Sequence, residues 1–556
     1  MLLSAIARRP CAIARVFTAT RRAGAPSLAE TVGYRSCRVK AASYTRPMSS
    51  LPDVCGLPVV TSSWGAIKSL DQAYNEYVNL SGDPYQRTEE ALDADPSCVM
   101  AHSLRGLLAA LGQADPGAVA TCLASAERAL LDCGKGSGGE GEGERERVFV
   151  ATLRAWSAGR WREGVLHLET WLMTSPQDLP ALKLAQDAHL TLGDSANMRD
   201  CVGRVLPLWV EGTYGYGNVL GMHAFGLVET GSYGLAEERA DVALALEPGD
   251  VWSVHAMAHV YEMEARASEG FSFLTDCRDK WEDKEGPLQQ HMAWHLGLFS
   301  LERGQETRAQ RIFDTLLAPP REGGKQAGAL RMPPPAPFAL TDACSLLWRM
   351  DILGVETGAQ RWRGVAEAWL LYHHARHLST FHDLHAVMAF TAMANGVDDS
   401  AEAYLWQARA EALVESMKDY VRSGGLRPTP EGLGGETPDA AQQPTPPGIV
   451  QLHSFSAGRN RGAVDAVGRR DTEELTVGNG GPGGAGAGPP DNLWVAEQVG
   501  VSLCEGMVAY RKGEFKEAVS MLLPLRYHLH AIGGSKAQQD VVHVTLLDAA
   551  LRLPHK

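Results

Sequence analysis

Residues 223–270 read HAFGLVETGSYGLAEERADVALALEPGDVWSVHAMAHVYEMEARASEG. The first half of this stretch has the pattern of a helix, a tight turn at Gly231–Tyr233, a second helix and a stop at Pro248. Small side chains let two antiparallel helices approach closely, and proline ends a helix because it lacks an N–H group. The small residues are Ala224, Ala236, Ala240 and Ala243. One such unit cannot bury its apolar face alone, so we expect similar units on both sides of it.

The same pattern recurs along the chain. It is found in residues 88–112, 148–176, 289–317 and 496–534. Units of this length and spacing resemble tetratricopeptide repeats, which stack into solenoids. No strand-like alternation of useful length interrupts them. The sequence therefore predicts an all-α fold, a right-handed α-solenoid of degenerate helix–turn–helix repeats.

Composition divides the chain into repeats and low-complexity segments. We expect a helical repeat array over residues 55–422 and C-terminal helical repeats over residues 491–556. Residues 423–490, which include the run GNGGPGGAGAGPP, are too rich in Gly, Pro and Thr for helices and are predicted to have little order. Two shorter segments, at about residues 134–147 and 320–337, are predicted to be flexible loops because they hold few apolar residues.

The first 50 residues differ in charge from the rest of the chain. They hold nine Arg and Lys residues against one acid, Glu30, which gives a net charge of +8. An Arg- and Ser-rich segment that is poor in acids is typical of an organelle transit peptide, so we expect a disordered mitochondrial leader. Plastid import is one alternative, and a cytoplasmic product that starts at Met48 is another.

The remainder of the chain is acidic, since subtracting +8 from the formal charge of −14 leaves −22. Phosphate binding needs a basic surface, so nucleic acid is disfavoured as a partner, and RNA binding is the weakest of our hypotheses. No run of 18 apolar residues exists, which predicts no membrane span. The ten cysteines include no C-x-x-C pair, and we expect free thiols.

The helix predicted from Val251 to about Ala265 has two distinct faces. At 100° per residue, an apolar stripe that should pack holds Val254, Met257, Ala258 and Tyr261. A second stripe, roughly 130° away, is expected to line the concave groove of the array. Neighbouring first helices stack side by side in a solenoid, so two residues of the next repeat should join this stripe. The predicted binding groove consists of Trp252, His255, His259, Glu262, His291 and Trp294.

Four of these residues, His255, His259, Glu262 and His291, are also candidate metal ligands. Two imidazoles one helical turn apart, with a third histidine or a carboxylate, can bind zinc or iron. Ala256 stands where a metalloprotease of the H-E-x-x-H type has its general base, so that mechanism is excluded. Our main interpretation assigns no metal, no cofactor and no catalytic residue. Further histidines, at 373, 374, 377, 382 and 385, are expected to be solvated or part of the core.

Five strings of sequence are more specific than the generic repeat. They are KLAQDAHLTLGDSANMRDCVGRVLPLW from Lys183, WSVHAMAHVYEM from Trp252, HMAWH from His291, DACSLLWRM from Asp342 and LLPLRYHLHAIGGSKAQQDVV from Leu522. Together they resemble the tetratricopeptide repeat protein 38 family over most of residues 55–550. The resemblance implies an α-solenoid of degenerate repeats and brings no assigned activity, substrate or cofactor.

The sequence thus predicts a non-enzymatic scaffold that receives a protein or peptide partner in its concave groove. Aromatic side chains would supply buried area there, and His and Glu would orient the partner by hydrogen bonds. The alternative is an enzyme or a small-molecule or metal-binding protein that uses the four candidate ligands.

Overall fold

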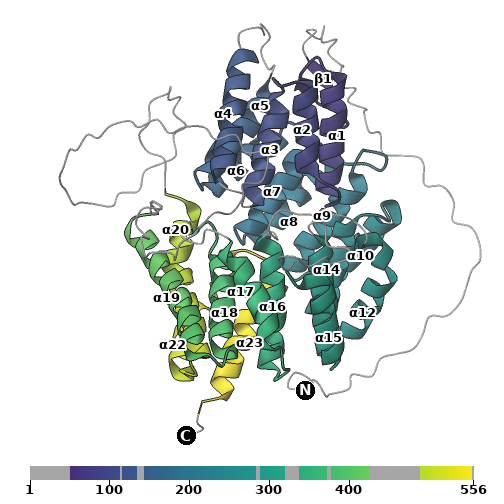
Figure 1. The fold of residues 1–556 in the computed structure, drawn as a ribbon. Coiled ribbons are helices and arrows are strands. Elements are labelled where there is room, and N and C mark those ends of the chain that lie inside the picture. The colour runs from purple at the N-terminus through teal and green to yellow at the C-terminus, as the bar shows by residue number, and fades with distance from the viewer. Residues whose placement is uncertain are drawn as a thin grey trace, which may run out of the picture.

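The computed structural model describes residues 50–112, 116–133, 143–282, 288–319, 337–371, 377–425 and 489–553. Within these ranges the predicted all-α fold is confirmed, because successive helices pack in antiparallel pairs (Figure 1). The described strands form one short antiparallel hairpin, β1 (Ser50–Pro52) and β2 (Pro58–Val60). The predicted leader, except for residue 50, and most of the predicted loops and insertion lie outside the described residues.

The helices of the first half are α1 (Trp64–Val78), α2 (Pro84–Ala94), α3 (Val99–Leu111), α4 (Pro116–Cys133), α5 (Glu144–Ser157), α6 (Trp161–Leu172), α7 (Leu179–Thr191), α8 (Ser195–Val205), η2 (Leu206–Leu208), α9 (Tyr216–Glu229), α10 (Tyr233–Leu246), α11 (Val251–Met263), α12 (Ala267–Asp276) and α13 (Arg278–Trp281). Those of the second half are α14 (Leu288–Glu302), α15 (Glu306–Ile312), η3 (Phe313–Leu317), α16 (Pro337–Ile352), α17 (Ala359–Leu370), α18 (Thr380–Gly396), α19 (Ser400–Arg422), α20 (Asp491–Val495), η6 (Ala496–Gly500), α21 (Val501–Arg511), α22 (Phe515–Leu525), η7 (Leu529–Ile532) and α23 (Lys536–Leu551).

Local sequence signals fix the ends of α11, the helix that carries the predicted site. The preceding helix α10 ends two residues before Pro248. The N-cap of α11 is Asp250, whose carboxylate accepts a hydrogen bond from the N–H of Trp252 at 3.1 Å. The predicted start at Val251 is confirmed.

Glycine at a helix crossing explains how close two repeats approach. Gly297 of α14 faces Leu346 of α16, and a Cβ atom at Gly297 would lie 2.8 Å from the Leu346 Cδ2 atom. A larger residue would therefore require the Leu346 side chain or α16 to shift. Gly297 thus has the packing role of a small residue in the repeat pattern.

The predicted loop at residues 134–147 is wrong at its C-terminal end. Residues 144–147 form the first turn of α5, and Arg145 is buried between two carboxylates that are fully buried. Its Nη1 atom lies 2.6 Å from Asp53, and its Nε and Nη2 atoms lie 2.7 and 2.9 Å from Asp178. The segment is predicted to be a flexible loop because it holds few apolar residues. The prediction fails at Arg145 because its partners, Asp53 and Asp178, are distant in sequence.

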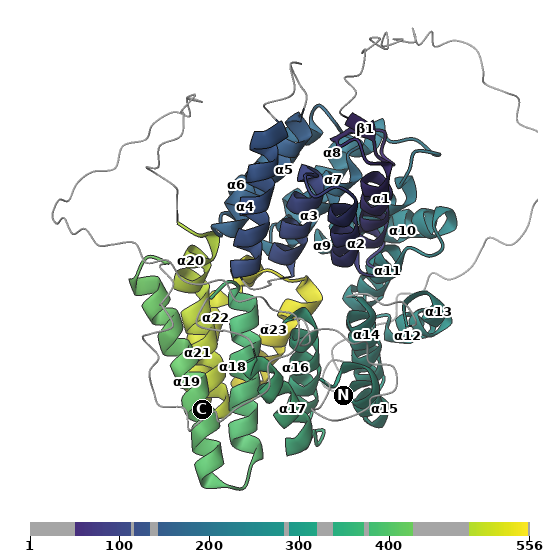
Figure 2. The same ribbon diagram turned by 45° about the horizontal axis from the view of Figure 1, so that its top comes forward.

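The C-terminal part of the chain closes the array into a ring. After the last gap, the N–H of Asp491 donates to the carbonyl of Gly159 at 3.0 Å. Further on, the backbone carbonyl of His530 lies against Gly193. A Cβ atom on residue 193 would be 1.6 Å from the carbonyl oxygen of His530. Helix α23, drawn in yellow, lies beside α16 and α22 and also contacts α11 (Figure 2). The last helix therefore packs inside the curve of the array.

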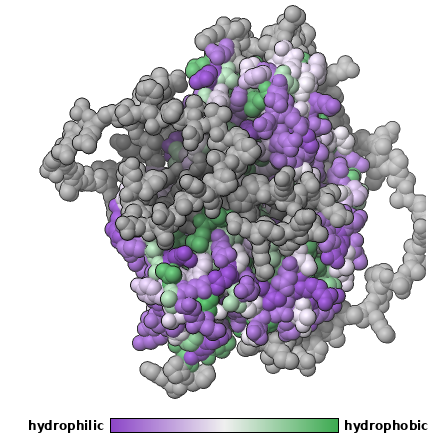
Figure 3. All heavy atoms as spheres, viewed as in Figure 1, coloured by the Kyte–Doolittle hydropathy of each residue, from purple (hydrophilic) through white to green (hydrophobic). Residues whose placement is uncertain are grey.

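The described surface visible in Figure 3 is mostly hydrophilic, with hydrophobic residues in small separate patches. Among the described helices, none is long and apolar enough to cross a membrane.

Candidate metal centre

The structure corrects the predicted open groove. The side chains of Trp252, His255, His259, His291 and Trp294 lie together as expected, but each of these residues is at most 4% exposed. The physical reason is the return of the chain, because α16 and α23 pack against the face that the prediction left open. A peptide cannot dock on these side chains while α23 is in place.

Four histidines form a compact buried cluster. His255 and His259 come from α11, and His291 and His295 come from α14. One ring nitrogen from each lies within 4.8 Å of the chosen nitrogens of the others. The Nε2 atom of His255 is 2.8 Å from Nε2 of His259 and 2.9 Å from Nε2 of His291.

His295 was not among the predicted candidates. Its ring centroid lies 4.6 Å from that of His259 and 4.8 Å from that of His291. The signal for it was present in the sequence, because HMAWH repeats the four-residue spacing of HAMAH. Two such pairs on stacked helices bring four imidazoles to one point.

Two buried carboxylates hold the outer nitrogens of the cluster. The Oδ2 atom of Asp342 in α16 lies 2.8 Å from Nδ1 of His291. At the end of α9, the Oε1 atom of Glu229 lies 3.4 Å from Nδ1 of His259. The Asp342 carboxylate accepts the proton on Nδ1 of His291 and so leaves the lone pair on its Nε2, which is the tautomer that a metal-binding histidine needs. Glu229 lies close to Nδ1 of His259 but forms no hydrogen bond with it. No signal in the sequence marked either carboxylate.

Protein groups alone leave this cluster poorly hydrogen-bonded. If His259 and His291 both present lone pairs on Nε2, a single proton on Nε2 of His255 would have to serve both. Within the described residues, the Nδ1 atoms of His255 and His259 and both nitrogens of His295 are buried without a hydrogen-bond partner. Buried polar atoms of this kind are rare in folded proteins, and a bound ion is one of the usual reasons for them.

The charge balance also fits a cation. Burial lowers the pKa values of His255 and His295 well below the ordinary value, and burial lowers the pKa of His259 as well. Glu229 and Asp342 have side chains only 1% exposed, and no Lys or Arg forms an ion pair with either among the described residues. A divalent ion would neutralise the two carboxylates, and buried charges are stable only when they are compensated.

The spacing of the nitrogens suits a transition metal. Metal–nitrogen bonds of 2.0–2.1 Å place ligands about 2.9 Å apart at right angles, about 3.4 Å apart in a tetrahedron and about 4.2 Å apart when they are opposite. The two shortest Nε2 separations, 2.8 and 2.9 Å, are close to the right-angle spacing. All four nitrogens lie within 4.8 Å, so the rings need to close in by less than about 2 Å to hold one ion. Four imidazoles are ligands that suit zinc, copper, iron or nickel.

Glu262, the remaining predicted site residue, stands apart from the cluster. Its Oε2 atom is buried without a hydrogen-bond partner. Burial raises its pKa to about 8, the Arg349 guanidinium lowers it, and the carboxylates of Glu302 and Asp540 raise it further. A protonated carboxyl is a poor metal ligand, so the structure replaces Glu262 by His295 in the candidate set.

The predicted aromatic residues pack around the histidines. The Trp252 ring lies 4.8 Å from the His255 ring, and the Trp294 ring stacks on His291 at 5.1 Å. They enclose the cluster in apolar surface, which strengthens electrostatic interactions inside it.

In the second predicted group of histidines, His377 and His385 are part of the core, and His382 is partly exposed. His377 connects Asp383 and Ser416, each at 3.0 Å, in the order of a Ser–His–Asp triad. Ser416 lies in the middle of α19, however, and not on the sharp strand-to-helix turn of a nucleophile elbow. His385 contacts the carbonyl of Phe381 at 2.7 Å. Residues 373 and 374 lie outside the described residues.

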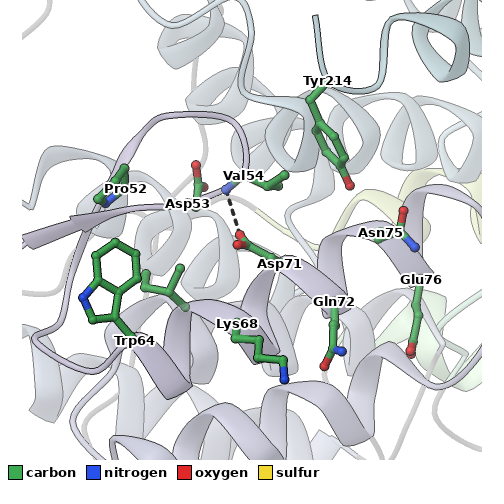
Figure 4. A pocket seen from close by; sticks show the side chains of 11 residues that line it. Pro52, Asp53, Val54, Trp64, Lys68, Asp71, Gln72, Asn75, Glu76 and Tyr214 are labelled. Atoms are coloured by element: carbon green, nitrogen blue, oxygen red, sulfur yellow. Dashed lines mark hydrogen bonds between the residues drawn. The ribbon is translucent and has the colours of Figure 1, made fainter.

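A surface hollow of about 590 Å³ lies elsewhere, between the hairpin and α1 (Figure 4). Asp71 accepts a hydrogen bond there from the N–H of Val54 at 2.8 Å, and burial raises the pKa of Asp71 to about 6. Trp64, Lys68 and Tyr214 are also part of the lining. None of the predicted site residues borders this hollow.

Comparison with known proteins adds little to this picture. No family model matches the chain. Among solved structures, a chain of the Naa15/Naa10 complex bound to HypK-THB is 12% identical, with 88% of this chain and 85% of that chain covered and a TM-score of 0.24. At this TM-score the match supports no statement about function. The fold and the site therefore define a helical-repeat protein with a buried four-histidine cluster.

Proposed function

We propose that this protein is a helical-repeat metalloprotein that binds one divalent transition metal ion through His255, His259, His291 and His295. The observation that carries the proposal is the convergence of four buried imidazole nitrogens within 4.8 Å of one another. The buried carboxylates of Glu229 and Asp342 support it, because Asp342 orients the His291 ring and both carboxylates balance the charge of the ion.

The strings that resemble the tetratricopeptide repeat protein 38 family also support a site at the histidine cluster, because most of them lie at or around it. Four of the five contribute to the cluster or its surroundings: α11 and α14 supply the histidines, α16 supplies Asp342, and α23 covers them. The fifth, from Lys183, forms α7 and α8, whose connecting Gly193 contacts the segment before α23. Membership of that family is part of this proposal, and the cluster is the feature that its members would share.

The test is the metal content of the full-length protein. After reconstitution with Zn²⁺, Fe²⁺, Ni²⁺ or Cu²⁺ and gel filtration, we expect about one ion per chain for at least one metal. His255→Ala/His295→Ala should lose that ion. These two histidines are chosen because neither is bonded to a carboxylate, so their removal leaves no buried carboxylate unpaired.

The matched control is His528→Ala/His543→Ala, which removes two exposed histidines from the same chain. It should keep the ion. Circular dichroism must show that both variants are folded, and His295→Phe, which keeps a ring without a lone pair, replaces the double variant if that one unfolds. Equal metal content in the cluster variant and the control, or no bound metal in the wild type, would refute the proposal.

We also propose partner binding, the function predicted from the repeats, as a second role. The helical-repeat fold supports it, since paired helices expose long outer faces. Burial removes five of the six predicted residues, all except Glu262, from the docking surface. Crosslinks between the folded full-length protein and co-purifying proteins should therefore map to exposed positions on outer helices, and crosslinks to α11 or α14 would contradict this.

A further inference from the structure

The two carboxylates beside the histidines have a second set of partners, and both belong to the first turn of α23. The Oε2 atom of Glu229 accepts a hydrogen bond from the backbone N–H of Lys536 at 2.9 Å. The Oδ1 atom of Asp342 accepts one from the Nε2 atom of Gln538 at 3.0 Å. Asp342 thus bonds a histidine through one oxygen and α23 through the other. Glu229 bonds α23 through Oε2, and its Oε1 atom lies 3.4 Å from Nδ1 of His259.

The first turn of α23 is built to hold these carboxylates. Ser535 and Gln538 form a capping box, in which each side chain bonds the backbone N–H of the other residue. The helix N-terminus carries partial positive charge, which favours nearby anions. Because Ser535 and Gln538 are only 3% exposed, these bonds are sheltered from water.

The rest of the segment is attached to the ring by contacts that do not involve the cluster. Arg349 donates to the carbonyl of Ala537 at 2.8 Å, and the Trp348 indole donates to Thr545 at 2.8 Å. Ala537 lies in the first turn and Thr545 further along, so these bonds hold α23 against α16 independently of the carboxylates. Glu229 and Asp342 connect the neighbourhood of the cluster directly to the first turn.

We propose that metal binding and the seating of α23 are coupled through Glu229 and Asp342, so that the occupied cluster fastens the C-terminal helix and the empty cluster loosens its first turn. The inference rests on the proposed metal-binding function. Without a cation, the two buried carboxylates are compensated only by α23 and neutral imidazoles, and a buried charge that is poorly compensated weakens the seat. With a cation, the carboxylates are neutralised and stay aligned between histidine and helix. Linkage then requires that whatever unseats α23 weakens metal binding by the same factor.

Lys536 offers a matched pair of variants. It is the first residue of α23, where proline fits the helix, and the extended backbone of Ser535, with φ −81° and ψ 163°, suits a residue before proline. Lys536→Pro removes the N–H that bonds Glu229, whereas Lys536→Ala removes an exposed side chain and keeps the N–H. Gln538→Ala removes the donor to Asp342.

The experiment measures metal affinity by competition with a chelating dye, and amide hydrogen exchange of residues 536–551, on the full-length protein with and without the ion. We expect Lys536→Pro and Gln538→Ala to bind the ion about tenfold more weakly, the lower end of the range for outer-shell partners, and Lys536→Ala to bind like the wild type. In the wild type, the metal should slow exchange in the first turns of α23 by about the same factor.

The outcomes separate the two proposals. A wild-type protein that holds no ion refutes the proposed function itself. A wild-type protein that binds the ion, with unchanged affinity in Lys536→Pro and Gln538→Ala and no effect of metal on exchange in α23, keeps the function and overturns the coupling.

Discussion

Replacing Glu262 by Gln should make the protein more stable at neutral and alkaline pH. The folded-state pKa of Glu262 is raised from 4.5 to about 8, first by burial. Between these values the unfolded chain loses its proton while the folded protein keeps it, so stability falls as pH rises from 4.5 towards 8. The glutamine side chain has the same shape as the neutral acid and does not titrate.

The magnitude follows from the shift in pKa. Each pH unit in this range costs at most about 1.4 kcal/mol, so the full shift of about 3.5 units sets an upper limit of about 5 kcal/mol. Between pH 5 and pH 7.5 the wild type should lose up to about 3 kcal/mol relative to Glu262→Gln. The two proteins should be almost equally stable at pH 5.

The assay is urea unfolding at pH 5, 6, 7 and 8, monitored by circular dichroism. The midpoints and slopes of the unfolding curves of the two proteins are compared. Glu238→Gln, which changes an exposed acid on α10, is the control and should follow the wild type. Parallel pH profiles for the wild type and Glu262→Gln would show that Glu262 is ionised in the folded protein, and the assignment of a buried neutral acid would be wrong.

Other consequences of the structure can be measured with single substitutions. His295→Ala should lower the affinity for the bound metal by at least tenfold, as judged by dye competition, because it removes one of the proposed ligands; an unchanged affinity would exclude this residue from the site. Asp342→Asn should weaken metal binding about 10–100-fold, because the amide cannot hold His291 in the required tautomer as a carboxylate does, and it should leave the helical content measured by circular dichroism intact. Arg145→Met should destabilise the fold by about 3–5 kcal/mol in urea unfolding, because it leaves Asp53 and Asp178 buried without a cation; a loss below about 1 kcal/mol would mean that the ion network contributes little.

The repeat architecture could be predicted because its signals are local. Pro248 and the small residues of residues 223–270 determine where helices end and how closely they pack, and both properties depend on neighbours within one or two repeats. The contact between the rings of His255 and His291 was predictable for the same reason, since α11 and α14 are the first helices of consecutive repeats.

The burial of the cluster could not be predicted from the same signals. Helix α11 is buried on every face from Val251 to Tyr261, and one of those faces is covered by residues almost 300 positions later in the chain. Periodicity within α11 carries no information about such a distant partner. Asp342 begins the string DACSLLWRM, and Glu229 lies within residues 223–270. The residues next to them in sequence give no sign that either carboxylate lies beside a histidine.

Arg145 was misjudged for a related reason. It follows a Gly- and Glu-rich run, and in sequence it resembles that run more than it resembles a core. Its partners Asp53 and Asp178 are separated from it by 92 and 33 residues. Burial of such a charge can be recognised only from the three-dimensional structure, which brings its distant partners together.

The return of the last helix into the ring has a consequence for how the protein is made. An open solenoid can fold repeat by repeat as it leaves the ribosome, because each unit needs only its neighbour. Here the contacts of Gly159 with Asp491 and of Gly193 with the region of His530 join segments more than 300 residues apart. The histidines are synthesised long before their cover, so a nascent chain presents them to the cell until α23 emerges. Maturation of this protein should therefore end with a slow closing step, and that interval is when a metal ion can reach the site without opening the finished fold.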